Sequence, residues 1–167
     1  QFLLQQNQAF LRQVIDAFPG CIIVKNRDGK FILVNREAAK FYGDDIDDII
    51  GKYEYEFAGL NPSNEKEIDK FLADDRQVID TGTPKIITNE EFTLQNGELR
   101  TFNVTKIPIE FTKHENCVLV VATDVTDRVR KENALKESEE RFRQVYEHMA
   151  VGIARVSLNF RIERANE

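Results

Sequence analysis

The residues of this chain whose types could support catalysis or metal binding are few and widely spaced. His114 and Cys117 lie three positions apart, a spacing at which the two side chains can share a metal ion or act as base and nucleophile. A zinc site needs two further ligands and a catalytic triad needs a third, orienting residue, and none of these clusters nearby in the sequence. We therefore predict no metal ligand and no catalytic residue.

Carboxylates occur in two charged runs. Residues 44–48 hold four aspartates, and Glu65 and Glu67 follow. An acid–base pair needs burial to separate its two pKa values, whereas charge runs usually lie on solvated faces or in first helical turns. The scattered glycines form no phosphate-binding loop. The chain is therefore predicted not to be an enzyme. The alternative, a small α+β enzyme, would need a cleft in which polar groups converge.

Composition indicates a folded protein that does not bind nucleic acid. Hydrophobic residues make up 41% of the 167 positions, more than a disordered chain would contain. The formal net charge of -6 opposes binding to phosphates, which requires clustered Lys and Arg. The sequence has no signal-peptide pattern and no apolar run near the ~18 residues that span a bilayer. We expect a cytoplasmic location, with any membrane anchor elsewhere in a longer parent protein.

Apolar periodicity predicts an α+β order of elements, with five strands and interposed helices. The expected elements are a helix over residues 1–18, a hairpin of Cys21–Lys25 and Lys30–Val34, short helices at Arg36–Tyr42 and Asp45–Ile50, an amphipathic helix at Asn64–Thr81, strands at Lys85–Leu94, Leu99–Phe111 and Cys117–Thr123, and a long charged helix from Val125 to His148. Cys21 and Cys117 both fall in strands, where we expect reduced core residues.

An internal repeat relates the two ends of the chain. A single shift of 131 positions pairs Gln13 with Gln144 and Asn35 with Asn166, among other matches. Residues 150–167 should therefore begin a second copy of the fold, with a turn at Ser157–Asn159, and stop early. Because one hairpin is at best marginally stable alone, we expect this segment to be disordered or packed on a neighbour.

The residues at the turns and element ends together resemble the PAS domain family. These residues are Asp28 and Gly29 in the hairpin, Asn35 before the first short helix, Gly43, Ile50 and Gly51, and Asp124, Val125 and Thr126 after the last strand. The resemblance implies a five-stranded antiparallel sheet with helices on one face and a small-molecule pocket beneath them. It divides the chain into a flanking helix at 1–18, a PAS domain at 19–124, a signalling helix at 125–149 and a truncated second copy at 150–167.

The resemblance also assigns a set of residues to the pocket. The apolar and hydroxyl candidates are Phe41, Tyr42, Phe57, Leu72, Ile79, Phe92, Phe102, Val104, Val121 and Thr123, and the amide candidates are Asn35 and Asn103. The alternative is an ordinary packed core, because the same side chains fill cores and ligand sites.

Two of the family's cofactors are disfavoured by the sequence. Haem-binding members use a histidine on the longer helix, and Asn64–Thr81 contains none. Members that form a flavin photoadduct use a cysteine in a helical Asn-Cys-Arg context, which neither cysteine has. Non-covalent flavin, another small organic ligand and no ligand at all stay open.

We expect the signal to leave the domain at its C-terminal end, where the long helix begins. Asp124 and Thr126 can cap the following helix, and the resemblance makes them the junction that relays signals to it. The stripe of Leu135, Phe142 and Val145 predicts a parallel two-stranded coil, although one helix packing on its own domain is the alternative. We expect a homodimer through both flanking helices.

Two kinds of sensory protein are compatible with this module. One is a sensor histidine kinase of a two-component system, and the other is a cyclic-dinucleotide enzyme such as a diguanylate cyclase. In both, the output domain would lie outside this chain. A ligand-free dimerisation or spacer module is the second hypothesis.

Overall fold

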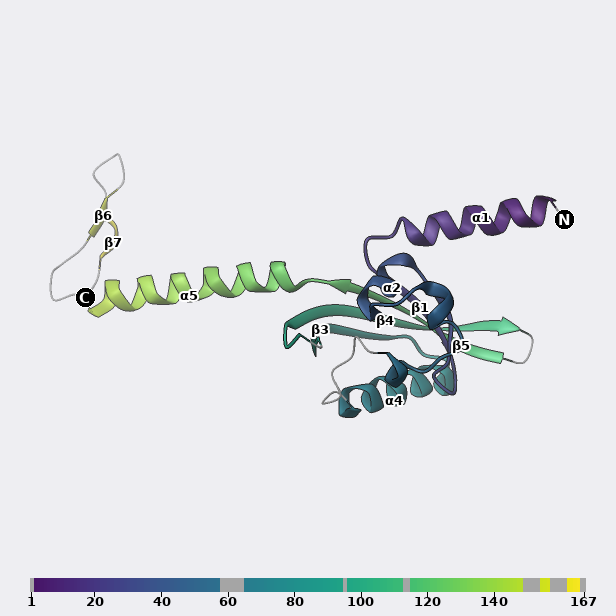
Figure 1. Ribbon diagram of the computed structural model, residues 1–167. Helices are drawn as coiled ribbons and strands as arrows, with labels where there is room; N and C mark the ends of the chain where they lie inside the picture. The colour runs from purple at the N-terminus through teal and green to yellow at the C-terminus, as the bar shows by residue number, and fades with distance from the viewer. Residues whose placement is uncertain are drawn as a thin grey trace. The chain divides into compact units, whose positions relative to one another are not determined.

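Five segments of alternating or continuous apolar residues form one antiparallel sheet in the computed structural model (Figure 1). Its strands are β1 (Cys21–Asn26), β2 (Phe31–Val34), β3 (Lys85–Thr93), β4 (Leu99–Thr112) and β5 (Glu115–Asp124). The order across the sheet is β2-β1-β5-β4-β3. The structure describes residues 2–57, 65–94, 96–112, 115–148, 154–156 and 162–165.

The helices follow the predicted order. They are α1 (Phe2–Asp16), α2 (Arg36–Tyr42), α3 (Ile46–Ile49), the 3-10 helix η1 (Glu54–Glu56), α4 (Glu65–Thr81) and α5 (Thr126–His148). The α+β class and the five-stranded antiparallel sheet are confirmed. The helix η1 was not predicted, because three residues are too few for periodicity to detect. None of the helices that the structure describes is long and apolar enough to cross a membrane.

The chain divides into two units. Residues Gln1–Thr126 contain the five-stranded sheet with α1 to α4, and Asp127–Glu167 contain the rest of α5 and a second pair of strands. In that pair, β6 (Ala154–Val156) runs antiparallel to β7 (Ile162–Ala165). The predicted turn at Ser157–Asn159 and residues 149–153 and 166–167 lie outside the described residues. The second-copy assignment stays a prediction.

The core fills the space between one face of the sheet and helices α2 to α4. Alternation along the strands turns side chains such as Ile23 and Val104 inward, where they meet Ala38 of α2 and Val78 of α4. Burying this apolar surface is the main favourable contribution to folding of the first unit.

A β-bulge changes the phase of edge strand β3. Ile87 pairs with Val104, but the next paired residue is Glu90, opposite Phe102, so β3 holds one extra residue between the two pairs. Asn89 takes φ 54 there, and its backbone N–H donates to the Asn103 side chain at 3.0 Å. Because of the extra residue, Glu90 returns to the face that Ile87 occupies.

Asn35 joins α1, β1 and α2 through its side chain. Its Oδ1 accepts from the backbone N–H groups of Ala38 and Ile22, both at 3.0 Å. Its Nδ2 donates to the carbonyl oxygens of Ile15 at 3.0 Å and Gly20 at 2.8 Å. The buried amide is therefore both the N-cap of α2 and the bridge that holds the end of α1 to the sheet.

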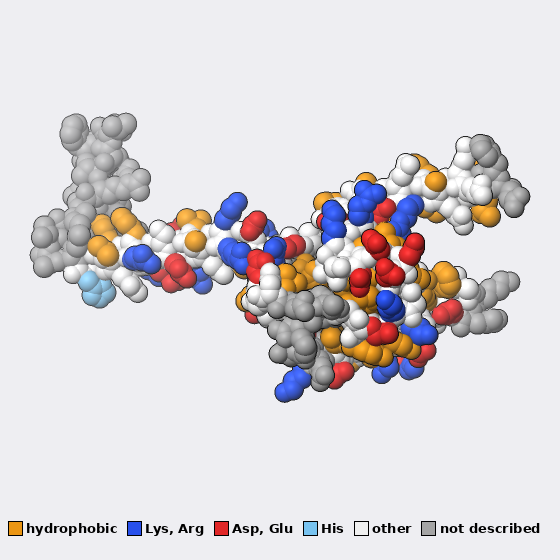
Figure 2. Space-filling view, in the orientation of Figure 1, with side chains coloured by type: hydrophobic (Ala, Val, Ile, Leu, Met, Phe, Trp, Pro, Cys, Tyr) orange, Lys and Arg blue, Asp and Glu red, His pale blue; other side chains and the backbone are white. Residues whose placement is uncertain are grey.

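Most of α1 nevertheless presents apolar side chains to solvent. Leu4 and Leu11 are 63% and 61% exposed, and Leu3, Phe10 and Val14 are exposed as well. Figure 2 shows hydrophobic side chains along this helix among polar ones. Such an exposed apolar stripe is typical of a surface that another protein chain covers.

Replacing Asn35 should destabilise the first unit strongly. Asn35→Ala leaves two buried N–H groups and two carbonyl groups without their side-chain partner, so we expect a loss of about 3 kcal/mol in the free energy of unfolding. Asn96→Ala removes a single hydrogen bond in an exposed turn and should cost under about 1 kcal/mol. Urea unfolding followed by circular dichroism measures both, and equal losses would contradict the role assigned to Asn35.

Candidate functional site

A cavity of about 80 Å³ lies between the inner face of the sheet and the helices. It is bounded by apolar side chains over most of its surface and by ionisable ones at particular points. Its lining residues are Cys21, Ile23, Lys25, Phe41, Tyr42, Glu54, Phe71, Glu90, Phe92, Phe102, Val104, Lys106, Val120 and Ala122.

One part of the lining is aromatic. Phe41 of α2 lies with its ring centroid 5.6 Å from those of both Phe92 and Phe102, on β3 and β4. Phe71 of α4 lies 5.8 Å from Phe92. These rings come from two helices and two strands, so they form a rigid apolar wall whose faces suit a flat or short hydrocarbon group.

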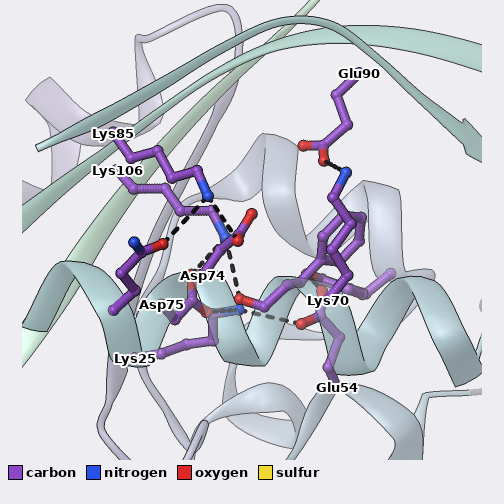
Figure 3. A network of polar contacts seen from close by, with 11 residues as sticks. Lys25, Glu54, Lys70, Asp74, Asp75, Lys85, Glu90 and Lys106 are labelled. Carbon is purple, nitrogen blue, oxygen red and sulfur yellow. Dashed lines mark hydrogen bonds and ion pairs between the residues drawn. The ribbon is translucent and has the colours of Figure 1, made fainter.

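A buried chain of charges forms another part of the lining (Figure 3). Lys25 of β1 and Lys106 of β4 point inward and are only 4% and 3% exposed. Their Nζ atoms each lie 2.6 Å from a different carboxylate oxygen of Asp75, a residue of α4. Lys106 also donates to the carbonyl oxygen of Phe71 at 3.2 Å. One buried aspartate thus joins two strands to helix α4.

Glu54 extends this chain at its other end. Its Oε2 lies 3.1 Å from Lys25 Nζ, and its Oε1 accepts from the Tyr42 hydroxyl at 2.7 Å. The order Glu54, Lys25, Asp75, Lys106 alternates negative and positive charge and has no net charge. Such compensation is required, because a buried ion without a partner costs several kcal/mol.

The pKa values follow from this arrangement. Burial opposes the charge of Lys25, but Glu54 and Asp75 outweigh burial and raise the pKa of Lys25 above its ordinary value. Burial also opposes the charge of Asp75, but Lys25 and Lys106 lower the pKa of Asp75. Burial and the neighbouring Glu54 raise the pKa of Tyr42, which therefore stays a neutral donor. At neutral pH Lys25 is therefore protonated, Asp75 is ionised and Tyr42 is neutral.

Two further ion pairs tie α4 to β3. Lys70 lies 2.8 Å from Glu90, and Lys85 lies 2.7 Å from Asp74. Both lysines are substantially exposed, so each pair contributes little to stability by itself. Of the ion pairs described for α4, those of Asp75 are the ones in which both partners are buried.

The structure places five of the predicted pocket residues on the cavity wall. These are Phe41, Tyr42, Phe92, Phe102 and Val104. They come from α2, β3 and β4, and the chain separates α2 from these two strands by more than 40 positions.

The other predicted pocket residues lie elsewhere. Phe57 and Ile79 belong to the packed core, and Leu72 lines a separate surface groove beside Gly29. The side-chain amide of Asn35 forms hydrogen bonds with backbone groups. The side chain of Asn103 accepts a hydrogen bond from the Asn89 backbone N–H at the β3 bulge.

Val121 and Thr123 point to the opposite face of β5 from the cavity residues Val120 and Ala122. The run from Val118 to Ala122 is apolar on both faces, so its own sequence gives no indication of which residues point inward. Its pairing with β1, where Ile23 lies opposite Val120, decides the phase.

Sequence reasoning missed the ionisable wall. A signal was present: Cys21, Ile23 and Lys25 alternate on one strand, and Phe102, Val104 and Lys106 alternate on another. Continuing either series by one step places a lysine on the inner face. Glu54 and Asp75 had no comparable signal, because each lies among other acidic residues.

The predicted junction is a compact set of hydrogen bonds. The Thr126 backbone N–H donates to Asp124 Oδ1 at 2.9 Å, and Thr126 Oγ1 accepts from the Thr101 backbone N–H at 2.9 Å. Arg100 lies 2.9 Å from Asp124. Burial opposes the charge of Asp124, but these hydrogen bonds and Arg100 lower the pKa of Asp124. The first residue of α5 is thereby fastened to β4 and β5.

The thiols have no reactive environment. Cys21 and Cys117 are buried, and burial, with the nearby Glu37 and Asp124, raises the pKa of Cys21 to about 12. His114 lies outside the described residues, so its predicted relation to Cys117 is not described. Among the described side chains, no group of three or more His, Cys, Asp or Glu residues is placed to hold a metal ion.

Comparison with known proteins places this arrangement in a family. The family model described as PAS fold matches residues 15–130. The PAS domain of Bordetella pertussis BvgS is 25% identical, with a TM-score of 0.55, 80% of this chain covered and 98% of that one. The fold and its cavity define a small sensory α+β domain. The chain belongs to the PAS fold family.

Two proteins of Vibrio cholerae are also similar. A diguanylate cyclase is 26% identical over 110 residues, which are 65% of this chain and 33% of that protein. A complex of VqmA with a ligand and DNA is 21% identical with a TM-score of 0.60, covering 74% of this chain and 52% of VqmA. The chain spans a third or less of the curated relatives that it matches.

Removing the Asp75 carboxylate should make the free energy of unfolding less dependent on pH in the acidic range. Asp75→Asn leaves two buried lysines with Glu54 as the remaining carboxylate, so we expect a loss of about 3–5 kcal/mol at neutral pH. The pKa of Asp75 is lowered on folding, so its contribution is present above about pH 4 and is lost as the pH falls further. The stability difference between wild type and variant should therefore narrow as the pH falls through that range.

Urea unfolding at a series of pH values measures this difference. Asp80→Asn is the matched control, because Asp80 pairs with Arg27 at the surface and its loss should leave stability nearly unchanged. A gap between wild type and Asp75→Asn that stays constant with pH would contradict the assignment.

Proposed function

We propose that this chain is a sensory module that binds a small organic molecule in the cavity and transmits its occupancy to α5. The observation that carries the proposal is a cavity bounded by aromatic rings and by a compensated set of buried charges. Buried lysines are rare in packed cores, and a ligand site uses a few placed polar groups in an apolar lining. VqmA, a protein of the same fold, is bound to a ligand in its solved complex.

The size of the cavity limits the ligand. About 80 Å³ is well below the roughly 300–1,000 Å³ typical of sites for drug-sized molecules. A flavin has a three-ring system and would need a much larger space, so a short organic compound is the better candidate. Haem is disfavoured because α4 carries no histidine.

The register of the sheet offers a route for the signal. Phe102 lines the cavity and pairs with Asp124, and its neighbour Thr101 exchanges hydrogen bonds with Val125 and Thr126. A ligand that shifts β4 against β5 therefore also shifts the groups that begin α5. Asp124 and Thr126 would be the relay residues.

The apolar stripes on the flanking helices support a homodimer. Leu4, Leu11 and Val14 on α1 are exposed, and Phe142 and Val145 on α5 are exposed as well. Vibrio cholerae VqmA, of the same fold, is a dimer. We propose that both helices of one chain pair with those of a second copy.

The relatives support two candidates for the parent protein. A diguanylate cyclase matches this chain over a third of its length, so a cyclic-dinucleotide enzyme is the first candidate, and a sensor histidine kinase is the second. In either case this chain would be the sensory part, in the cytoplasm, and catalysis would belong to an output domain of the same polypeptide. The alternative, a ligand-free dimerisation module, is favoured only by the small volume of the cavity.

Filling the cavity should abolish ligand binding without unfolding the domain. Ala122→Leu adds a larger side chain to the wall, whereas the control Val121→Leu adds a methylene to the same strand on its other face. Ligand-observed NMR with a library of small fragments measures binding to both. We expect saturable hits for wild type and Val121→Leu that disappear in Ala122→Leu. A library without hits on wild type would favour the ligand-free module.

Charge on the α1 stripe should dissociate the dimer. Leu4→Glu with Leu11→Glu places two like charges in the proposed interface of each chain, and we expect a shift from dimer to monomer in light scattering. Gln5→Glu adds a charge on the opposite side of α1 and should leave the mass unchanged. A wild-type mass that equals one chain at every concentration would contradict the proposed dimer.

A further inference from the structure

The carboxylate of Glu54 occupies a binding site made by other elements. Lys25 of β1 donates to one of its oxygens at 3.1 Å, and the Tyr42 hydroxyl of α2 donates to the other at 2.7 Å. An ammonium and a neutral phenol on the two oxygens of one carboxylate form the arrangement by which proteins recognise small acids. Both donors also line the cavity.

Glu54 lies in a much shorter element than the other acid of the charge chain. It belongs to η1, a single turn of three residues, whereas Asp75 lies inside the 17-residue helix α4. Its neighbour Tyr55 is 67% exposed. Short 3-10 turns with few buried contacts are among the segments that open most easily.

An exit for Glu54 is present on its other side. Glu54 and Lys25 line both the interior cavity and a surface groove, which Tyr53, Leu72 and Arg76 also border. A rotation of Glu54 toward this groove, which Arg76 also borders, would place its carboxylate in water. The carboxylate would then leave the buried site without becoming a buried charge elsewhere.

Charge balance limits which kind of ligand can replace the Glu54 carboxylate in the cavity. With Glu54 gone, Lys25 and Lys106 face one carboxylate, that of Asp75, and the buried group carries one excess positive charge. A neutral molecule would leave that charge uncompensated, and a cation would double it, whereas one carboxylate restores neutrality.

We propose that the cavity takes a small monocarboxylic acid, whose carboxylate displaces that of Glu54 from Lys25 and Tyr42 and whose apolar tail lies against the aromatic wall. Glu54 is then a built-in competitor that sets the threshold for binding. This inference rests on the proposed sensory function of the same cavity. Each additional methylene that fits should tighten binding about fourfold, until the cavity is full.

The test compares acids with amides of the same shape. Acetate, propionate and butyrate are titrated into the wild-type domain at constant ionic strength and neutral pH, alongside acetamide, propionamide and butyramide, and binding is followed by protein NMR. We expect saturable binding of the acids that strengthens with chain length, and binding of the amides at least about tenfold weaker.

Two variants then test the role of Glu54. Glu54→Gln removes the competing charge, so the affinity for the acids should rise by about tenfold or more. Glu56→Gln removes one negative charge from the same turn at an exposed position, and the Gln side-chain oxygen can still accept from the Tyr53 backbone N–H, so the affinity should stay unchanged. Acid and amide titrations of the unmodified domain need no variant, so the test survives if Glu54→Gln folds poorly.

The outcomes separate this inference from the proposed function. Equal affinity of acids and amides, or equal affinity of Glu54→Gln and Glu56→Gln for the acids, would overturn the displacement of Glu54. Binding of neutral fragments but not of acids would overturn it too and leave the sensory cavity in place. Binding of neither class, to a domain whose Ala122→Leu variant behaves like wild type, would remove both proposals together.

Discussion

The position of α4 over the sheet depends on one buried aspartate. Lys25 and Lys106 enter the interior from two strands, and Asp75 is the acid that both contact. Two ammonium groups cannot stay buried without it, so α4 must dock where Asp75 reaches both. Since apolar packing alone would let the helix slide, this requirement supplies the directional part of the interface, and the cavity is the space that remains beside it.

Polar side chains also fix the two ends of the domain. Asn35 holds the end of α1 to β1 and α2, and Thr126 with Asp124 holds the beginning of α5 to β4 and β5. Both flanking helices are thus attached by hydrogen bonds to strands that border the cavity. A displacement of the strands can therefore be transmitted to either helix through these hydrogen bonds. Hydrogen bonds depend on direction, whereas apolar contacts do not.

Much of this fold could be predicted from the sequence, and the ionisable site could not. Periodicity and turn residues placed all five strands within two residues of their ends, because alternation and Gly-rich turns are local signals. Local sequence could not show which residues of β5 face the interior, because β5 is apolar on both faces. Pairing with the neighbouring strand β1 determines which residues point inward. Glu54 and Asp75 meet Lys25 only after η1 and α4 have folded over β1, so no spacing along the chain could have paired them.

The extra residue at Asn89 bends edge strand β3 without changing which side chains face the interior. Upstream of it Ile87 faces inward, and after a spacing of three Glu90 faces inward again. A homologue that lacked one residue here would keep both side chains on the same face, now at the regular spacing of two, and would lose only the bend. The curvature of this edge can therefore vary in evolution while the chemistry presented to the interior is preserved.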